Sequence, residues 1–307
     1  TGTLTERELS VLRVEVTGGA TEAEVNGCLR ALEDGTKHPV GQAIARYAET
    51  AGGAGGAAVA LRERGLLPGK GVRGVDEEGR ELLLGSAAWL AASGVTGAEH
   101  AEQAARVRVV LARAGRVIAR VFVGEVLRAE AKEAIEELTR QGMTSFMLTG
   151  DGSSGASEAA EILGIEVSAG LSAEDKVRAL AAAGGGVAMV GDGINDAPAL
   201  AATRPSFAVH GGTDLARGMA QVSLLTPDLR LVPWTIALSK RAFSIARTNL
   251  IGSTIYNLVF LGLATAGLLR PVWAGISMAT SSLLVLASAS RIRTFDKVEE
   301  PEEESPL

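Results

Sequence analysis

The sequence predicts an α/β protein built on a parallel sheet, followed by two helices that cross a membrane. Two observations lead to this prediction. Short apolar strands followed by helical segments recur from Ser145, Gly186 and Ser206, and repeated strand–helix units form parallel sheets with helices on both faces. Further along, residues 250–269 and 271–290 carry no charged side chain, and each run has the ~20 residues that a helix needs to span a bilayer.

The composition narrows the class of protein. A chain of 307 residues is long enough for about two domains. Hydrophobic residues make up 47% and charged residues 21%, so the chain is neither disordered nor built only of membrane spans. A net charge of −6 with no basic cluster argues against nucleic acid as a partner. The single cysteine, Cys28, rules out an intrachain disulfide.

The most informative stretch is residues 187–200, which read VAMVGDGINDAPAL. The first four residues predict a buried strand, which ends at a Gly-Asp-Gly turn. Asp192 and Asp196 then fall where the strand gives way to a helix. Two carboxylates at the carboxyl end of a strand in an α/β protein suit a hard Mg²⁺ ion. The alternative is that these aspartates only cap the helix.

A second set of polar residues follows the strand predicted at 145–148. Thr149, Gly150 and Asp151 stand at its carboxyl end, before a helix over 154–163. Because parallel strands end at the same edge of a sheet, we expect these residues to lie near the two aspartates of the 187–200 motif.

The 187–200 motif resembles the hinge motif of P-type ATPases, ion pumps built on a haloacid-dehalogenase-type phosphotransfer domain. The opening residues, Thr-Gly-Thr-Leu-Thr, resemble the second part of the P-type signature Asp-Lys-Thr-Gly-Thr-Leu-Thr, whose Asp is phosphorylated by ATP. The resemblance implies that the carbonyl of Thr1 binds Mg²⁺ and that the hydroxyl of Thr3 contacts the phosphoryl group. The phosphorylated Asp would stand before Thr1, so we expect a carboxyl-terminal portion of a pump that is inactive by itself.

Two further stretches match the same family. Residues 149–151 resemble its Thr-Gly-Asp-Asn signature, and residues 171–176 resemble its Pro-Glu-Asp-Lys element with Ala173 in place of Pro. A lysine at a helix start opposes the helix dipole, so Lys176 needs an anion nearby unless it is simply solvated. The resemblance implies the following catalytic residues around the phosphoryl group: Thr1, Thr3, Thr149, Gly150, Asp151, Lys176 and Asn195.

The region from 9 to 123 has a different pattern. Residues 12–16 alternate as a strand, residues 20–32 predict a helix, and residues 106–123 predict a strand pair that turns at Ala114-Gly115. We therefore expect an α+β domain inserted into the phosphotransfer domain.

Within this insert the family resemblance implies a nucleotide site. A His-Pro pair at a helix start is bland by itself, and a Gly-x-Gly run is common in plain turns. In heavy-metal P-type ATPases, however, such a pair positions adenine, and a Glu five residues earlier belongs to the same pocket. The resemblance therefore assigns ATP to Glu33, His38, Pro39, Gly69, Gly71 and Gly85, although Ser86 stands where the family has Asn.

Basic residues flank the two uncharged runs. Lys240, Arg241 and Arg247 precede the first, and Arg291 and Arg293 follow the second. By the positive-inside rule both ends are cytoplasmic. We therefore expect a multi-pass protein of the cell membrane with the bulk of the chain in the cytoplasm.

Polar side chains within the two spans indicate the transported ion. The first span carries Tyr256 and Asn257, and the second carries Met278 and Ser281. A thioether is a soft ligand suited to Cu(I), although small hydroxylated residues also pack helices together. The pattern resembles the copper-transporting branch of the heavy-metal pumps. Zinc-type members place Lys and Asp in these spans, and the two runs here have neither.

The sequence thus predicts a haloacid-dehalogenase-like (Rossmann-type) phosphorylation domain with an inserted α+β nucleotide-binding domain and two transmembrane helices. The expected boundaries are 1–8 and 124–230 for the phosphorylation domain, 9–123 for the insert, 231–249 for a cytosolic connecting helix, 250–293 for the two spans and 294–307 for an acidic tail.

The resemblance implies a fragment of an ATP-driven heavy-metal (copper) transporter that works through an aspartyl-phosphate. Its cofactors would be ATP and Mg²⁺, and its partners the transported cation, the lipid bilayer and the missing amino-terminal part of the pump. Two alternatives remain. One is a nucleotide-binding remnant without turnover. The other is a soluble phosphatase of the dehalogenase-like fold, which the two uncharged runs and the His-Pro insert disfavour.

Overall fold

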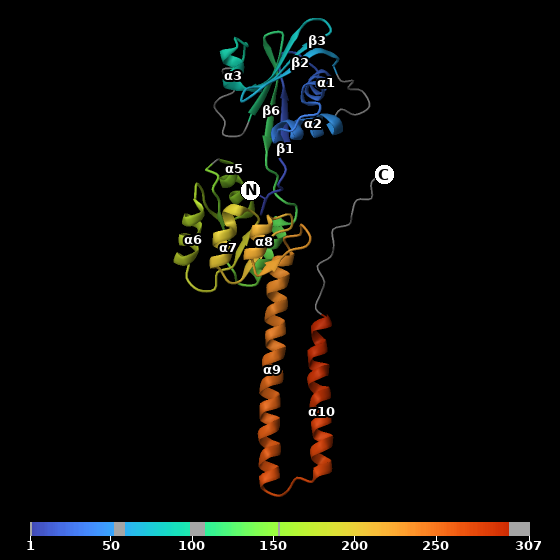
Figure 1. Cartoon of the computed structure of the whole chain (residues 1–307), viewed down its shortest axis with the longest axis vertical. Helices are drawn as coiled ribbons and strands as arrows, with labels where there is room; N and C mark the ends of the chain where they lie inside the picture. The colour runs from blue at the N-terminus through green and yellow to red at the C-terminus, as the bar shows by residue number, and fades with distance from the viewer. Residues whose placement is uncertain (1, 52–58, 99–107, 153, 295–307) are drawn as a thin grey trace. The chain divides into compact units, whose positions relative to one another are not determined.

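The computed structural model describes residues 2–51, 59–98, 108–152 and 154–294 (Figure 1). The chain divides into two compact units. The first unit comprises Thr1–Ala131 with Ser145–Pro227, and the second comprises Lys132–Thr144 with Asp228–Leu307.

A six-stranded antiparallel sheet forms the larger sheet of the first unit. Its strands lie in the order β1-β6-β5-β4-β3-β2. Their bounds are β1 Ser10–Val16, β2 Leu61–Leu67, β3 Gly71–Asp76, β4 Glu81–Ser86, β5 Arg108–Arg113 and β6 Arg116–Gly124. The strand pair predicted at 106–123 is the β5–β6 hairpin. Its turn residues Ala114 and Gly115 both have positive φ, as a two-residue hairpin turn that follows the sheet twist requires.

Helices cover both faces of this sheet because successive residues of a strand point to opposite sides. Leu82 and Leu84 of β4 pack in one core with helices α1 (Glu22–Glu33) and α2 (Pro39–Ala51). Leu83 packs in a second core with helix α3 (Ala87–Ala92). Figure 1 shows α1 and α2 on one side of the sheet and α3 on the other. The insert is therefore an α+β layer structure, as its sequence pattern predicts.

The edge strand β1 and its antiparallel neighbour β6 carry the chain into and out of the sheet side by side. Beyond them, Thr5 bridges Leu127, and the amide of Glu6 donates to the carbonyl of Val126 at 2.8 Å. The residues before β1 and after β6 therefore lie together, 120 residues apart in sequence, where the chain returns to the parallel part of the unit.

The parallel part consists of two small sheets rather than the single sheet that the strand–helix units predict. Strands β9 (Met189–Gly191), β10 (Ser206–Ala208) and β11 (Val222–Ser223) form one, in the order β11-β10-β9. Strands β7 (Phe146–Leu148) and β8 (Glu166–Ser168) form the other. Each of these five strands has two or three residues.

Helices connect these short strands as predicted. Helix α5 (Ser154–Leu163) matches the expected range. Helix α8 (Asp214–Met219) starts after Thr213, whose hydroxyl caps it. The other helices here are α6 (Ala173–Ala182), the 3₁₀ turn η3 (Ile194–Asp196) and α7 (Ala197–Ala202).

The second unit contains α4 (Ala131–Arg140, of which all but the first residue belong to this unit), α9 (Leu231–Thr265), α10 (Pro271–Ser290) and the 3₁₀ turn η4 (Arg291–Thr294). Helices α9 and α10 run antiparallel and side by side (Figure 1). The predicted connecting helix and the first uncharged run form one continuous helix of 35 residues.

Of the helices in the described ranges, one is long and apolar enough to cross a membrane, at Val272–Ser290. The other uncharged run, residues 250–269, differs from expectation because α9 ends at Thr265 and Gly267 turns the chain with positive φ. Its helical part also includes the polar side chains of Tyr256 and Asn257, which lower its hydropathy.

Candidate active site

Two buried aspartates follow the end of β9, as the 187–200 motif predicts. Asp192 and Asp196 are each 8% exposed. The amide of Asp192 donates to Oδ2 of Asp196 at 3.4 Å, so the two residues form one compact turn around η3. Burying a carboxylate without a compensating charge is costly, so each aspartate needs a cation.

Lys176 supplies the cation for Asp196. Its Nζ lies 2.7 Å from Oδ1 of Asp196, and its side chain is 10% exposed. The lysine is held at the start of α6, where the Ser172 hydroxyl accepts from the Asp175 amide and the Asp175 carboxylate accepts from the Ser172 amide. Lys176 therefore is not the solvated surface lysine of the alternative interpretation, and the anion that it contacts is the second aspartate of the motif.

Asp192 meets the amino-terminal loop. The Thr3 hydroxyl lies 3.5 Å from Oδ1 of Asp192, and the Arg7 guanidinium donates to Oδ2 from Nη2 at 3.0 Å and from Nε at 3.3 Å. The structure thus brings together Thr3, Lys176 and the two aspartates, four of the residues that the sequence assigns to the site. Thr1, which the sequence also assigns there, lies outside the described residues.

Three side chains that fix this loop were not assigned a role from the sequence. Arg128 donates from Nε to the carbonyl of Thr3 and from Nη2 to that of Gly2, both at 3.0 Å. Glu125 accepts from the Thr5 hydroxyl at 2.5 Å. The third side chain is Arg7. The short sequence Gly-Glu-Val-Leu-Arg at 124–128 is a detectable signal for Glu125 and Arg128, whereas Arg7 has no local signal because its partner is 185 residues away.

Thr149, Gly150 and Asp151 follow β7 as expected. Thr149 is 8% exposed, and its hydroxyl accepts from the amide of Asp151 at 3.0 Å. Its carbonyl accepts from the amide of Leu171 at 3.0 Å, which joins this turn to the segment that leads into α6 and Lys176. Asn195 lies within η3 with an exposed side chain, between the two aspartates in sequence.

The residues present fit a Mg²⁺ ion. Carboxylate oxygens are the hard ligands that this ion prefers, and one or two carboxylates commonly hold it together with phosphate oxygens and water. Asp192 retains 11% exposure of its side chain, enough to reach a ligand at the surface of the turn. In the part of the chain that the structure describes, no cluster of three or more His, Cys, Asp or Glu side chains could form an all-protein metal cage.

The predicted nucleotide residues lie around the end of α1 and the start of α2. Glu33 is 7% exposed, and burial raises the pKa of its carboxyl group, against the opposing effects of Thr36, Arg64 and His38. The Arg64 Nε donates to the carbonyl of Leu32 at 2.7 Å and closes the end of α1. A buried carboxylate with a raised pKa beside an exposed surface is a feature of binding sites.

His38 and Pro39 open helix α2. Pro39 is its first residue, where a missing N–H costs nothing, and the carbonyl of His38 accepts from the amide of Gln42 at 2.9 Å. The His38 amide donates to the Thr36 hydroxyl at 3.3 Å, and the His38 side chain is exposed. The imidazole is therefore accessible to a ligand, while its backbone is fixed by the helix start.

Two of the three predicted glycines have a packing role in the sheet. Gly71 and Gly85 pair with each other across β3 and β4. A Cβ atom at Gly71 would overlap the carbonyl of Leu84, and one at Gly85 would overlap the carbonyl of Lys70. Gly69 stands in the β2–β3 turn with a φ of 74° and open space around it. Ser86, found where the family has Asn, caps α3 by accepting from the amide of Trp89 at 3.3 Å.

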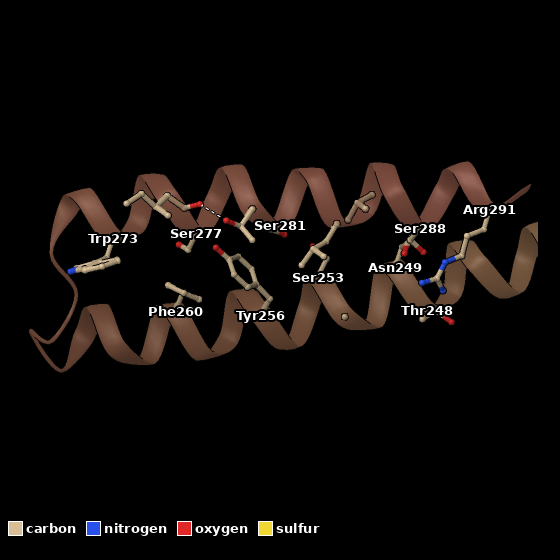
Figure 2. Close-up of a pocket in the computed structure, with 15 residues that line it drawn as sticks. Thr248, Asn249, Ser253, Tyr256, Phe260, Trp273, Ser277, Ser281, Ser288 and Arg291 are labelled. Atoms are coloured by element: carbon tan, nitrogen blue, oxygen red, sulfur yellow. Dashed lines mark hydrogen bonds between the residues drawn. The ribbon is translucent and has the colours of Figure 1, made fainter. Parts of the chain in front are cut away.

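A groove of about 690 Å³ lies between α9 and α10. Figure 2 shows the Tyr256 ring of α9 directed towards Ser277 of α10, with the Phe260 ring beside it. The centroids of the Tyr256 and Phe260 rings are 4.5 Å apart. Two of the four residues predicted for the transported ion, Tyr256 and Ser281, thus line one groove.

The other two predicted ion residues do not line it. Met278 is 71% exposed, and Asn257 is also exposed. Met278 and Ser281 are three residues apart on α10, yet only Ser281 lines the groove.

Comparison with known proteins gives the family. The sequence model of the haloacid dehalogenase-like hydrolase family matches residues 1–203, about two thirds of the chain. The copper-exporting P-type ATPases of Mycobacterium leprae and Mycobacterium tuberculosis are 34% and 32% identical, each over 97% of this chain. The chain spans 38% and 39% of the length of these two curated relatives.

Two solved structures that are similar to this chain also come from ATPases. A zinc-transporting PIB-type ATPase in its E2.Pi state is 32% identical, with a TM-score of 0.84 over 95% of this chain and 48% of that one. The catalytic domain of the CPx-ATPase CopB-B, from a study of its conformational changes upon nucleotide binding, is 26% identical in sequence to this chain. Its TM-score is 0.55, over 76% of this chain and 85% of that one. The chain therefore belongs to the haloacid dehalogenase-like hydrolase family, and within it is a homologue of the copper- and zinc-transporting P-type ATPases.

Proposed function

We propose that this chain is the ATP-binding and phosphotransfer portion of an ATP-driven copper pump, together with two of its membrane helices. The observation that carries the proposal is the cluster at the end of β9. There the side chains of Thr3 and Lys176 contact the two buried aspartates of one turn, although these residues come from three separate stretches of sequence. The match to a copper-exporting relative over 97% of this chain supports the same conclusion.

In this proposal the cluster handles the phosphoryl group. In the family signature the phosphorylated Asp stands two residues before the threonine that Thr1 matches. Mg²⁺, held by Asp192 with Asp196 and the Thr1 carbonyl, would neutralise charge on the transferred group. The Thr3 and Thr149 hydroxyls and the Asn195 amide would donate to its oxygens. Lys176 contributes a fixed positive charge in a buried site, where electrostatic stabilisation is strong. Gly150 and Asp151 complete the Thr149 turn.

ATP would bind to the insert. The exposed imidazole of His38 faces solvent beside the buried carboxyl group of Glu33, and Pro39 fixes the helix start from which His38 projects. The open turn at Gly69 leaves space for a ligand, and Gly71 and Gly85 let β3 and β4 approach closely behind it. In the pump, the γ-phosphoryl group of ATP would pass to the Asp of the signature with release of ADP, and water would then hydrolyse the aspartyl-phosphate; each of these two steps is easier than direct hydrolysis.

We place both α9 and α10 in the membrane, with the rest of the chain in the cytoplasm. Large hydrophobic side chains are exposed along both helices, among them Leu258 and Leu261 on α9 and Leu283 and Leu286 on α10. Exposed apolar surface of this length needs lipid or other membrane helices around it. The chain is about equally identical in sequence to copper and zinc transporters. The assignment of copper therefore rests on the Met278 thioether and on the absence of charged side chains from residues 250–269 and 271–290.

The decisive experiment measures ATP binding to the purified chain by calorimetry in the presence of Mg²⁺. We expect His38→Gln to weaken binding by about tenfold, since a lost stacking or hydrogen-bonding contact is worth roughly 1.4 kcal/mol. Lys37→Gln is the matched control, because Lys37 is the exposed neighbour. ATP binding that is absent, or equal in both variants, would remove the nucleotide site from the insert.

A further inference from the structure

Each carboxylate of the site already has a positively charged partner from the chain. Asp196 is paired with Lys176, and Asp192 with Arg7. The Arg7 contact has three hydrogen bonds: Nη2 to Oδ2 at 3.0 Å, Nε to Oδ2 at 3.3 Å and Nη2 to the Asp192 carbonyl at 3.3 Å. The cluster is therefore close to neutral, and a divalent cation cannot gain the full attraction of two free carboxylates.

The two cations differ in how firmly they are held. Lys176 projects from the capped start of α6, and its side chain is 10% exposed. Arg7 stands between the loop and β1, and its side chain is 41% exposed. Either aspartate would be left unpaired if its partner moved away, but the Lys176 ammonium is itself largely buried, whereas the guanidinium of Arg7 can rotate into water while an incoming cation takes over the charge of Asp192. Arg7 is thus the cation that can leave.

Two glycines border the Arg7–Asp192 contact. A Cβ atom at Gly2 would overlap Oδ2 of Asp192 and lie 3.2 Å from Cγ of Arg7. A Cβ atom at Gly211 would lie 3.6 Å from Nη1 of Arg7. The guanidinium therefore lies against Asp192 with the backbones of Gly2 and Gly211 close by, and it covers the carboxylate oxygen Oδ2 that a cation would bind.

We propose that Arg7 is a built-in counter-ion for Asp192, which a divalent cation must displace in order to bind. This inference rests on the proposed Mg²⁺ site at Asp192. Arg7 lowers the affinity of the site for the cation in two ways: it occupies the same carboxylate oxygen, and its positive charge repels a second cation nearby. In return, Arg7 keeps the Asp192 carboxylate paired when no cation is bound.

The test measures cation affinity directly, without turnover. Mn²⁺ serves as the probe, and the signal of free Mn²⁺ in electron paramagnetic resonance gives its dissociation constant for the full chain. We expect Arg7→Gln to tighten Mn²⁺ binding by about three- to tenfold, because a partly exposed ion pair is lost and with it a like-charge repulsion. Arg7→Lys keeps the charge but not the fork of donors, so its dissociation constant should fall between those of Arg7→Gln and the unchanged chain.

Arg46→Gln is the matched control. Arg46 is 47% exposed and pairs with Glu8 at 3.0 Å, so its loss changes the net charge equally without touching Asp192. A second readout is thermal unfolding. Without metal, Arg7→Gln should unfold at a lower temperature than the unchanged chain, and the increase caused by Mn²⁺ should be larger in the variant.

The inference is overturned if Arg7→Gln binds Mn²⁺ with unchanged or weaker affinity while Arg46→Gln behaves normally. Weaker binding would mean that Arg7 orients Asp192 for the cation rather than competing with it. Failure of the proposed site itself is a different result, namely that Asp192→Asn binds Mn²⁺ as well as the unchanged chain. The two outcomes are thus read from different variants.

Discussion

The Nζ atom of Lys176 lies 2.7 Å from Oδ1 of Asp196, and both side chains are about nine-tenths buried. This ion pair joins the capped start of α6 to the turn that follows β9. A buried pair contributes modestly to stability while intact, but the loss of either partner leaves an uncompensated charge. The pair therefore makes the geometry of the phosphotransfer cluster sensitive to a single substitution.

The first prediction concerns this pair. Lys176→Gln should lower the free energy of unfolding by about 2 kcal/mol, because the Asp196 carboxylate would stay buried without a cation. Hydrogen exchange of the β9 and α7 amides measures the change. Arg178→Gln is the control: Arg178 is 77% exposed, so the loss should be below about 0.5 kcal/mol.

The same substitution has a second test. Adding Asp196→Asn to Lys176→Gln removes the unpaired charge, so the double variant should recover part of the lost protection of β9. Equal losses in Lys176→Gln and in the Arg178 control would show that the pair has no special role.

The second prediction concerns Asp76, whose side chain is fully buried at the end of β3. Burial raises its pKa, but hydrogen bonds from the Arg80 backbone and from the Arg113 and Arg80 side chains outweigh burial and lower the pKa from 3.8 to about 2. A lowered carboxyl pKa stabilises the fold above the unfolded value, and this contribution is lost as the pH falls from about 4 to about 2.

Asp76→Asn should therefore cost about 2 kcal/mol at pH 7 and almost nothing near pH 2. Unfolding can be followed by Trp89 fluorescence after Trp234 and Trp273 have been replaced by Phe, so that the signal comes from the first unit alone. Glu77→Gln, at the exposed neighbour, is the control. A loss that does not depend on pH between 2 and 5 would contradict the assigned hydrogen bonds.

The third prediction concerns Glu33 and separates stability from binding. Burial raises the pKa of its carboxyl group, so the folded state binds this proton more readily than the unfolded state. Stability then falls as the pH rises through and above the ordinary pKa of 4.5, since the ionised form is the one that burial penalises.

Glu33→Gln should therefore make α1 more stable at pH 7, and the gain should vanish below pH 4.5. At the same time it should weaken ATP binding if Glu33 belongs to the nucleotide pocket. Hydrogen exchange of the α1 amides measures the first effect, and calorimetry measures the second. Asp34→Asn, an exposed neighbour, should change neither.

The fourth prediction concerns the transported ion. Met278→Leu keeps the size of the side chain and removes the soft sulfur, so the affinity for Cu(I) should fall by about tenfold in competition with a coloured Cu(I) chelator. Met219→Leu is the control, because Met219 is also partly exposed, at 46%, but lies on α8. Equal Cu(I) affinity in the two variants would remove Met278 from the ion path.

Much of the local structure follows from sequence patterns. The turn at Ala114-Gly115 was predictable because a two-residue hairpin turn needs positive φ, which Gly adopts readily, and both turn residues have positive φ in the structure. Helix α5 was predictable because its apolar residues repeat with helical spacing between clear turn signals. The end of α9 was not, since the glycine at 267 lies within an uncharged run whose composition alone does not mark where the helix stops.

The candidate site was predictable in its motif and not in its contacts. The 187–200 stretch identifies Asp192 and Asp196, and helix-dipole reasoning indicates that Lys176 needs an anion. No local pattern pairs Arg7 with Asp192 or Arg128 with the carbonyls of Gly2 and Thr3, because these partners are more than a hundred residues apart.

By itself the sequence determined the type of the main elements, the phosphotransfer motif and the likeness to heavy-metal P-type ATPases. All of these depend on side-chain chemistry and on spacing within a few residues. Only the tertiary structure decided which cation neutralises which aspartate, how the parallel strands divide into two sheets, and that Tyr256 and Ser281 share a groove while Met278 stays outside it. The physical reason is that charge pairs and burial form between residues far apart in sequence. They depend on how distant segments pack together, and the residues next to each partner in the sequence do not specify that packing.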